Sequence, residues 1–248
     1  KASLQYPLPS KGLGPAATQQ RIEALLPYGV GNTHPRFFGW VHGCGTPGNL
    51  IADIAAAAMN ANLGGRDHGA MYVEKQVVNW CRELFGFPAS ASGLVVSGTS
   101  IATVIALKVA RDRCLGFGSR TRGVGEAKLV GYTSTQTHSC VARAFDILGL
   151  GSDALRKIAV NERFEIDVDA LQSTIAADRA AGLTPFSVIG TAGAVNVGAI
   201  DDLEALADLA RPDVDVVLCS TSVPCGRAAD EVLSRADVRA NVVSREVD

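Results

Sequence analysis

The sequence lacks the residue patterns that mark metal, redox and nucleic-acid sites. Its six cysteines form no CxxC pair, which excludes a zinc ribbon and a thioredoxin-like redox motif. No HExxH motif occurs, so a zincin centre lacks its ligands and we expect no metal. Lysine and arginine form no basic run and the formal net charge is −2, so we expect no nucleic-acid partner.

Long apolar runs are missing as well. No apolar run reaches the about 18 residues that suggest a membrane-spanning helix, so no membrane partner is expected. Residues 1–14 are polar and rich in proline and glycine, unlike a signal peptide, and the scattered cysteines are typical of reduced thiols. These features predict a cytoplasmic protein. The first residue is Lys1 and not methionine, which indicates a processed, cloned or incomplete start.

What the chain does contain is a regular alternation of short apolar runs and helical periods. Its 248 residues, 47% hydrophobic and 19% charged, are enough for one large core. Two helices are expected first, at 50–63 and 71–85. Strands are then expected at 94–96, 128–132, 157–160 and 186–190, each followed by a helix. This alternation predicts βαβ units and an α/β fold with a mostly parallel sheet.

The histidine at position 138 is the most informative of the four histidines in the chain. His138 ends a polar run that connects a predicted strand to a predicted helix, and α/β proteins bind ligands at such junctions. An imidazole there could stack on a flat ring or transfer a proton. A surface histidine near a helix start, without a role, is the alternative.

Two other strand-to-helix junctions carry polar residues. Thr99 and Ser100 follow the first predicted strand and open a helix, where hydroxyls and backbone N–H groups bind an anion such as phosphate. Ordinary helix capping explains the same hydroxyls, and that alternative stays open. Thr191 follows the last predicted strand. Because the strands of a parallel sheet point the same way, these residues and His138 are expected along one carboxyl edge.

Four motifs carry a family resemblance in their order and spacing. They are HPRFFG at 34–39, SGTSxA at 97–102, YxSxQxHS at 132–139 and GTxGxxxxGAxD at 190–201. Together they resemble the group II pyridoxal-phosphate-dependent amino-acid decarboxylases, the family of aromatic amino-acid and glutamate decarboxylases. The resemblance implies a fold-type I PLP-dependent transferase-like large domain, incomplete at the C-terminus, and a homodimer. It also implies pyridoxal 5'-phosphate (PLP) as cofactor and an amino acid as the substrate that loses its carboxylate.

The resemblance implies roles for individual residues. His138 would stack on the pyridine ring of the cofactor and is the catalytic candidate. Thr99 and Ser100 would hold the phosphate, and Thr191 would lie beside the ring. These roles agree with the chemistry of the residues, because a helix start binds an anion and an imidazole stacks on a flat ring.

Two aromatic residues, Phe38 and Trp40, fall where the family lines its substrate pocket, although an aromatic residue there is as often plain core. The cofactor carries the chemistry and the protein orients it. By the resemblance, two protein groups would complete the site. They are a lysine that forms an imine with the cofactor and an aspartate that keeps the ring nitrogen protonated.

Both groups are missing where the resemblance places them. After about residue 210 the family would show a His-x-Asp-x-Ala strand and then the lysine, but residues 211–248 contain no histidine and no lysine. The lysines are Lys1, Lys11, Lys75, Lys108, Lys128 and Lys157. Asp213 or Asp215 could replace the aspartate by position alone, and a solvated tail without a role is the alternative. We therefore expect this chain to be inactive.

The resemblance also divides the chain. It predicts an N-terminal arm and helix at 1–49, a partial PLP-binding large domain at 50–210, and a tail at 211–248 that does not match the family. A reading-frame change or an artificial ending would explain the tail. Two alternatives to a decarboxylase stay open. One is a non-catalytic remnant or dimerisation module of the same fold, and the other is an aminotransferase or another lyase on that fold.

Overall fold

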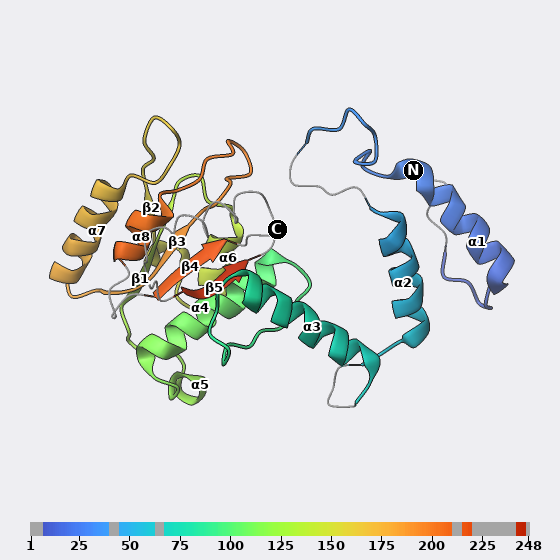
Figure 1. Ribbon diagram of the computed structural model, residues 1–248, viewed down its shortest axis with the longest axis horizontal. Helices are drawn as coiled ribbons and strands as arrows, with labels where there is room; N and C mark the ends of the chain where they lie inside the picture. Colours follow the sequence, from blue (N-terminus) through green and yellow to red (C-terminus); the bar gives the residue numbers. More distant parts are fainter. Residues whose placement is uncertain (1–6, 40–44, 63–66, 210–214, 220–241, 247–248) are drawn as a thin grey trace. The chain divides into compact units, whose positions relative to one another are not determined.

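The computed structural model describes residues 7–39, 45–62, 67–209, 215–219 and 242–246 (Figure 1). Contacts divide the chain into two units, Lys1–Ala61 and Asn62–Asp248, and each is described by itself. Trp40 and Asp213 lie outside the described residues. The predicted boundaries near residues 49 and 210 stay predictions.

The first unit is helical. Its elements are α1 (Gly14–Leu25), the 3-10 helix η2 (Leu26–Tyr28) and α2 (Pro47–Met59). Thr46 caps α2, because its hydroxyl accepts a hydrogen bond from the Asn49 N–H at 3.2 Å. The helix begins at Pro47, earlier than predicted, because proline fits the first helical position. It ends at Asn60, whose left-handed backbone (φ 44°) stops the helix.

The second unit is an α/β structure. Its helices are α3 (Gly69–Leu84), α4 (Thr99–Leu115), α5 (Ser119–Arg122), α6 (Cys140–Ile147), the 3-10 helix η3 (Ser152–Ala154), α7 (Val168–Ala180) and α8 (Leu203–Leu209). Its strands are β1 (Leu129–Ser134), β2 (Leu155–Ile158), β3 (Thr184–Gly190), β4 (Asp215–Cys219) and β5 (Val242–Glu246). They form one sheet in the order β2-β1-β3-β4-β5, and every neighbouring pair is parallel. The predicted α/β fold with a mostly parallel sheet is confirmed.

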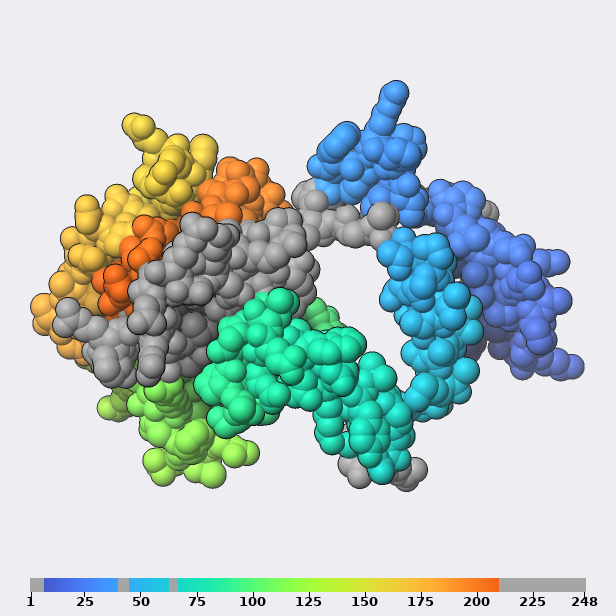
Figure 2. Space-filling model, in the orientation of Figure 1, coloured from blue at the N-terminus to red at the C-terminus, as the bar shows by residue number. Residues whose placement is uncertain are grey.

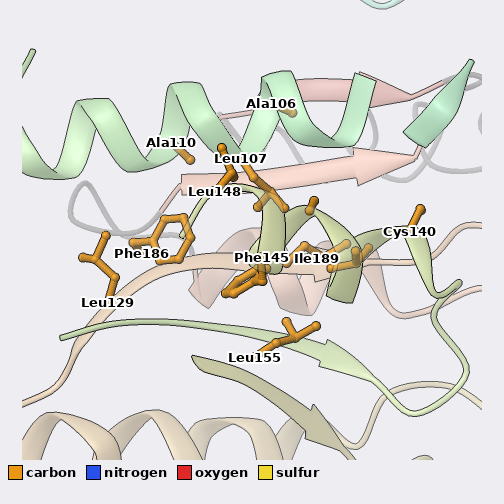
Figure 3. Close-up of a cluster of buried hydrophobic side chains, with 12 residues drawn as sticks. Ala106, Leu107, Ala110, Leu129, Cys140, Phe145, Leu148, Leu155, Phe186 and Ile189 are labelled. Carbon is orange, nitrogen blue, oxygen red and sulfur yellow. The ribbon is translucent and has the colours of Figure 1, made fainter. Parts of the chain in front are cut away.

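Helices cover both faces of this sheet (Figure 1). On the face covered by α4 and α6, Leu107, Phe145 and Phe186 are buried, and the two phenylalanine ring centroids lie 5.7 Å apart (Figure 3). On the face covered by α7 and α8, Leu171 and Leu206 belong to a second buried cluster. Burying one large apolar side chain contributes about 1.5–3 kcal/mol, so the two clusters fix the helices on the sheet.

One segment differs from the sequence prediction. Residues 94–96 form no strand; Leu94 and Val95 are each 58% exposed, and the Val95 N–H donates to Glu74 Oε1 at 2.9 Å. The hydrogen-bond acceptor of this backbone N–H is therefore a side-chain carboxylate and not the carbonyl of a neighbouring strand. Residues 211–248, the predicted tail, contain β4 and β5, and β4 pairs with β3.

Candidate functional site

Two of the predicted junctions meet at one edge of the sheet. β1 and β3 pair in parallel, so their carboxyl ends lie side by side. The turn 135–139 leads from β1 to α6, and Thr191 directly follows β3. In this turn, Thr137 Oγ1 lies 3.1 Å from Thr191 Oγ1. The hydroxyl contact joins the junction that carries His138 to the junction that carries Thr191.

His138 is exposed, and one nitrogen of its ring is held by the backbone. The Cys140 N–H donates to His138 Nδ1 at 3.2 Å. Because Nδ1 accepts this bond, the proton of the neutral imidazole is on Nε2. The ring is therefore held by a hydrogen bond at Nδ1, and its Nε2–H is available as a donor.

The start of α4 has no side-chain cap. The position that caps this helix is occupied by Gly98, at φ 119°, and not by one of the predicted hydroxyl residues. Glycine alone adopts this conformation without strain. Capping by the Thr99 or Ser100 hydroxyl therefore does not form the N-cap, and this favours the anion-binding interpretation of the helix start.

The first turns of α4 and α6 are in contact. Thr103 Oγ1 donates to Thr99 O at 2.8 Å and lies 3.7 Å from Cys140 Sγ. Cys140 in turn binds the His138 ring through its N–H. A chain of short contacts therefore connects Thr99 to His138, so the third predicted junction lies near the other two.

Asp201, the last residue of the fourth motif, organises the segment that carries Thr191. Asp201 is 4% exposed, and its carboxylate accepts from the Thr191 N–H and the Ile166 N–H, each at 2.7 Å. The Asp201 N–H donates back to Thr191 O at 2.9 Å. Burial raises the pKa of Asp201, while the two N–H donors favour its charged form.

Asp201 and its neighbour Asp202 have different roles. The cap of α8 comes from Asp202, whose Oδ1 accepts from the Ala205 N–H at 3.0 Å. The position of Asp201 at the end of a motif that starts beside Thr191 was the signal for its other role, since motif residues often contact each other.

Two further predicted residues, Phe38 and Asp215, lie within the described ranges. Phe38 is 93% exposed and belongs to the first unit. Asp215 opens β4, where it pairs in register with Ser187. Among the residues that the structure describes, no group of three His, Cys, Asp or Glu side chains is placed to hold a metal ion. Within the same ranges, no helix combines the length and the apolar character needed to cross a membrane.

Comparison with known proteins identifies relatives of the chain. "Aromatic-L-amino-acid decarboxylase" of Bacillus atrophaeus is 39% identical over 189 residues, which cover 75% of this chain and 37% of the relative. Human "Cysteine sulfinic acid decarboxylase" is 30% identical over 217 residues, 85% of this chain and 43% of the relative. The crystal structure of mouse CSAD is 26% identical with a TM-score of 0.81, and it covers 88% of this chain and 47% of that chain. This chain thus spans less than half the length of these relatives.

A family model matches as well. The model described as "Pyridoxal-dependent decarboxylase conserved domain" covers residues 7–218 and so ends within β4. The match confirms the predicted family and its cofactor, pyridoxal phosphate, and the structural likeness confirms the predicted fold class. With more than half of its residues matched and all three polar junctions within the match, the chain belongs to the pyridoxal-dependent decarboxylases.

Proposed function

We propose that this chain forms the cofactor-binding part of a PLP-dependent amino-acid decarboxylase, a carboxy-lyase, and that alone it binds PLP without turning over substrate. The observation that carries the proposal is the 3.1 Å contact between Thr137 Oγ1 and Thr191 Oγ1, because it joins the His138 turn to the end of β3. A site needs residues from several elements at one place, and this contact supports such a site.

The residues at this edge fit the cofactor. A negatively charged phosphate suits the start of α4, where Gly98 has φ 119°. A Cβ atom at Gly98 would have no atom within 4 Å apart from those of the neighbouring residues. Thr99 and Ser100 would hold the phosphate there. The exposed imidazole of His138 would stack on the pyridine ring, and Thr191 would lie beside it.

When bound, PLP supplies an electron sink for the electron pair that the departing carbon dioxide leaves behind. The chain's own residues orient the partners. His138 presents Nε2–H as a donor, because Nδ1 is engaged by the Cys140 N–H. Asp201 fixes the backbone of Thr191 by accepting a hydrogen bond of 2.7 Å from its N–H.

Absence of turnover follows from the lysine positions. The most C-terminal lysine in these 248 residues is Lys157, in β2, and the resemblance requires the lysine after β4. Without that lysine, the cofactor has only noncovalent contacts at this edge. We expect binding that is reversible and that borohydride does not convert into a covalent adduct.

The test is a titration of the purified chain with PLP, followed by the absorbance and fluorescence of the cofactor. We expect saturable binding, weaker binding of pyridoxal, which lacks the phosphate, and no amine product from a panel of amino acids. His138→Ala should weaken PLP binding. His34→Ala is the matched control, because the His34 ring is exposed and its Nδ1 accepts an N–H from Arg36 at 3.1 Å in the same local geometry.

Two results would contradict the proposal in different ways. A lysine adduct trapped by borohydride together with amine product would overturn the predicted lack of turnover. Absence of saturable PLP binding would overturn the assignment of the site itself.

A second candidate function is a dimerisation module, and exposed apolar side chains favour it. α3 lies at the surface in the space-filling view, where it is drawn in blue-green (Figure 2). Three of its large apolar side chains are exposed, Val73 at 64%, Trp80 at 61% and Leu84 at 65%. Exposed apolar area of this kind is typical of a protein interface. Sedimentation distinguishes the two functions, since a stable dimer that does not bind PLP favours the module.

A further inference from the structure

Thr137 is the centre of a cluster of hydroxyl groups at the edge of the sheet. Thr133 Oγ1 donates to Thr137 Oγ1 at 2.6 Å. Ser134 Oγ lies 3.2 Å from the same oxygen, and Thr191 Oγ1 lies 3.1 Å from it. Thr133 and Ser134 are buried, at 1% and 2% exposure, so water does not replace these contacts. Neither residue types nor motifs in the sequence single out Thr137.

These contacts use the full hydrogen-bonding capacity of the Thr137 hydroxyl. A hydroxyl has one proton to donate and two lone pairs to accept with. The single Thr133 proton is shared between Thr137 Oγ1 at 2.6 Å and the Ile189 carbonyl oxygen at 3.2 Å. The Thr137 proton goes to Ser134 or to Thr191, and the other of these two donates to Thr137. In both arrangements the Thr191 hydroxyl is engaged with Thr137 on one side and keeps its remaining capacity for a ligand.

Thr191 is therefore held at two points by different elements. Asp201 binds its backbone N–H at 2.7 Å, and Thr137 binds its hydroxyl at 3.1 Å. Thr137 is also the residue before His138, so the hydroxyl contact fixes the His138 turn against the end of β3. Asp201 cannot replace this contact, because its carboxylate reaches only the backbone of Thr191.

We propose that Thr137 is a positioning residue that selects the side-chain rotamer of Thr191 and so aims the Thr191 hydroxyl at the cofactor ring. The proposal rests on the proposed function as far as the ring is concerned. The rotamer itself is a property of the free chain, because threonine has more than one staggered rotamer and a fixed hydrogen bond selects one of them.

The first measurement concerns the free chain. Thr137→Val keeps the shape of the side chain and removes the hydroxyl, whereas Thr137→Ser keeps the hydroxyl. Three-bond NMR couplings to the Thr191 methyl group report its rotamer. We expect one rotamer in the parent chain and in T137S, and averaging in T137V. An unchanged Thr191 rotamer in T137V overturns the proposal, whether or not the chain binds PLP.

The second measurement is the dissociation constant and the spectrum of noncovalently bound PLP. One lost neutral hydrogen bond corresponds to about three- to tenfold weaker binding, which we expect for T137V with near-parent binding for T137S. Thr135→Val is the matched control, because Thr135 is exposed in the same turn and its hydroxyl is not part of the cluster. T137V that binds PLP like the parent, with the same spectrum, also contradicts the proposal. Failure of the parent chain to bind PLP overturns the proposed function instead.

Discussion

Replacing Asp201 by alanine should destabilise the protein more than the same replacement of an exposed aspartate. The side chain is 4% exposed and accepts two backbone bonds, each of 2.7 Å, from Thr191 and Ile166. Its removal leaves two N–H groups without their acceptor in a buried place. Each such group costs about 1–3 kcal/mol, so we expect Asp201→Ala to lower the free energy of unfolding by roughly 2–6 kcal/mol.

The neighbouring Asp202 provides the matched control. Asp202 is exposed and its side chain accepts one bond, from the Ala205 N–H at the start of α8, at 3.0 Å. Loss of a helix cap of this kind costs about 0.5–2 kcal/mol. Urea unfolding followed by circular dichroism gives the free energy of unfolding of both variants. We expect the slope of this free energy against urea concentration to be the same in both. If Asp201→Ala lowers the free energy of unfolding no more than Asp202→Ala does, the two buried bonds of Asp201 do not stabilise the fold as predicted.

Two further predictions concern stability elsewhere in the second unit. Burial alone would raise the pKa of Asp112, but hydrogen bonds from Lys108, Arg111 and Ser119 lower it from 3.8 to about 2. The lowered pKa stabilises the folded state, and this stabilisation is fully present above pH 3.8 and is lost as the pH falls toward about 2. We therefore expect Asp112→Asn to lose less stability than the parent chain over this pH range. An acid unfolding profile of the variant that matches the parent would contradict this prediction. A methyl group at Gly131 would lie 2.5 Å from Ser187 Oγ and 2.6 Å from Phe145 Cζ, so Gly131→Ala should cost about 1–3 kcal/mol in urea unfolding. Gly149→Ala is the control for backbone strain without a clash, because φ is 71° at Gly149 and an added Cβ would have no atom within 4 Å apart from those of the neighbouring residues. If Gly131→Ala destabilises the protein no more than Gly149→Ala does, the predicted clash at Gly131 is wrong.

The parallel sheet and the place of the site could be predicted from local sequence patterns. Alternating apolar runs and helical periods identified β1, β2 and β3, and polar residues after β1 and β3 identified the edge. Both inferences depend only on residues that are close in the sequence. Parallel pairing then brings the strand ends together, whatever the details of the turns.

The parts that were missed depend on partners far away in the chain. Asp201 binds the Ile166 N–H, 35 residues earlier, and no local pattern encodes that bond. Val95 donates to Glu74 and so leaves the predicted strand. Thr137 was not singled out because a threonine in a polar turn is common, and only its contacts with Thr133 and Thr191 distinguish it.

The family roles of Thr99, Ser100, His138 and Thr191 are best tested by locating the cofactor directly. Crystals of the chain soaked with PLP give the position of the phosphate and of the ring in a difference map. The account predicts the phosphate at the start of α4, beside Thr99 and Ser100, with the ring stacked on His138. A phosphate bound away from the α4 start, or a ring with no contact to His138, would contradict it.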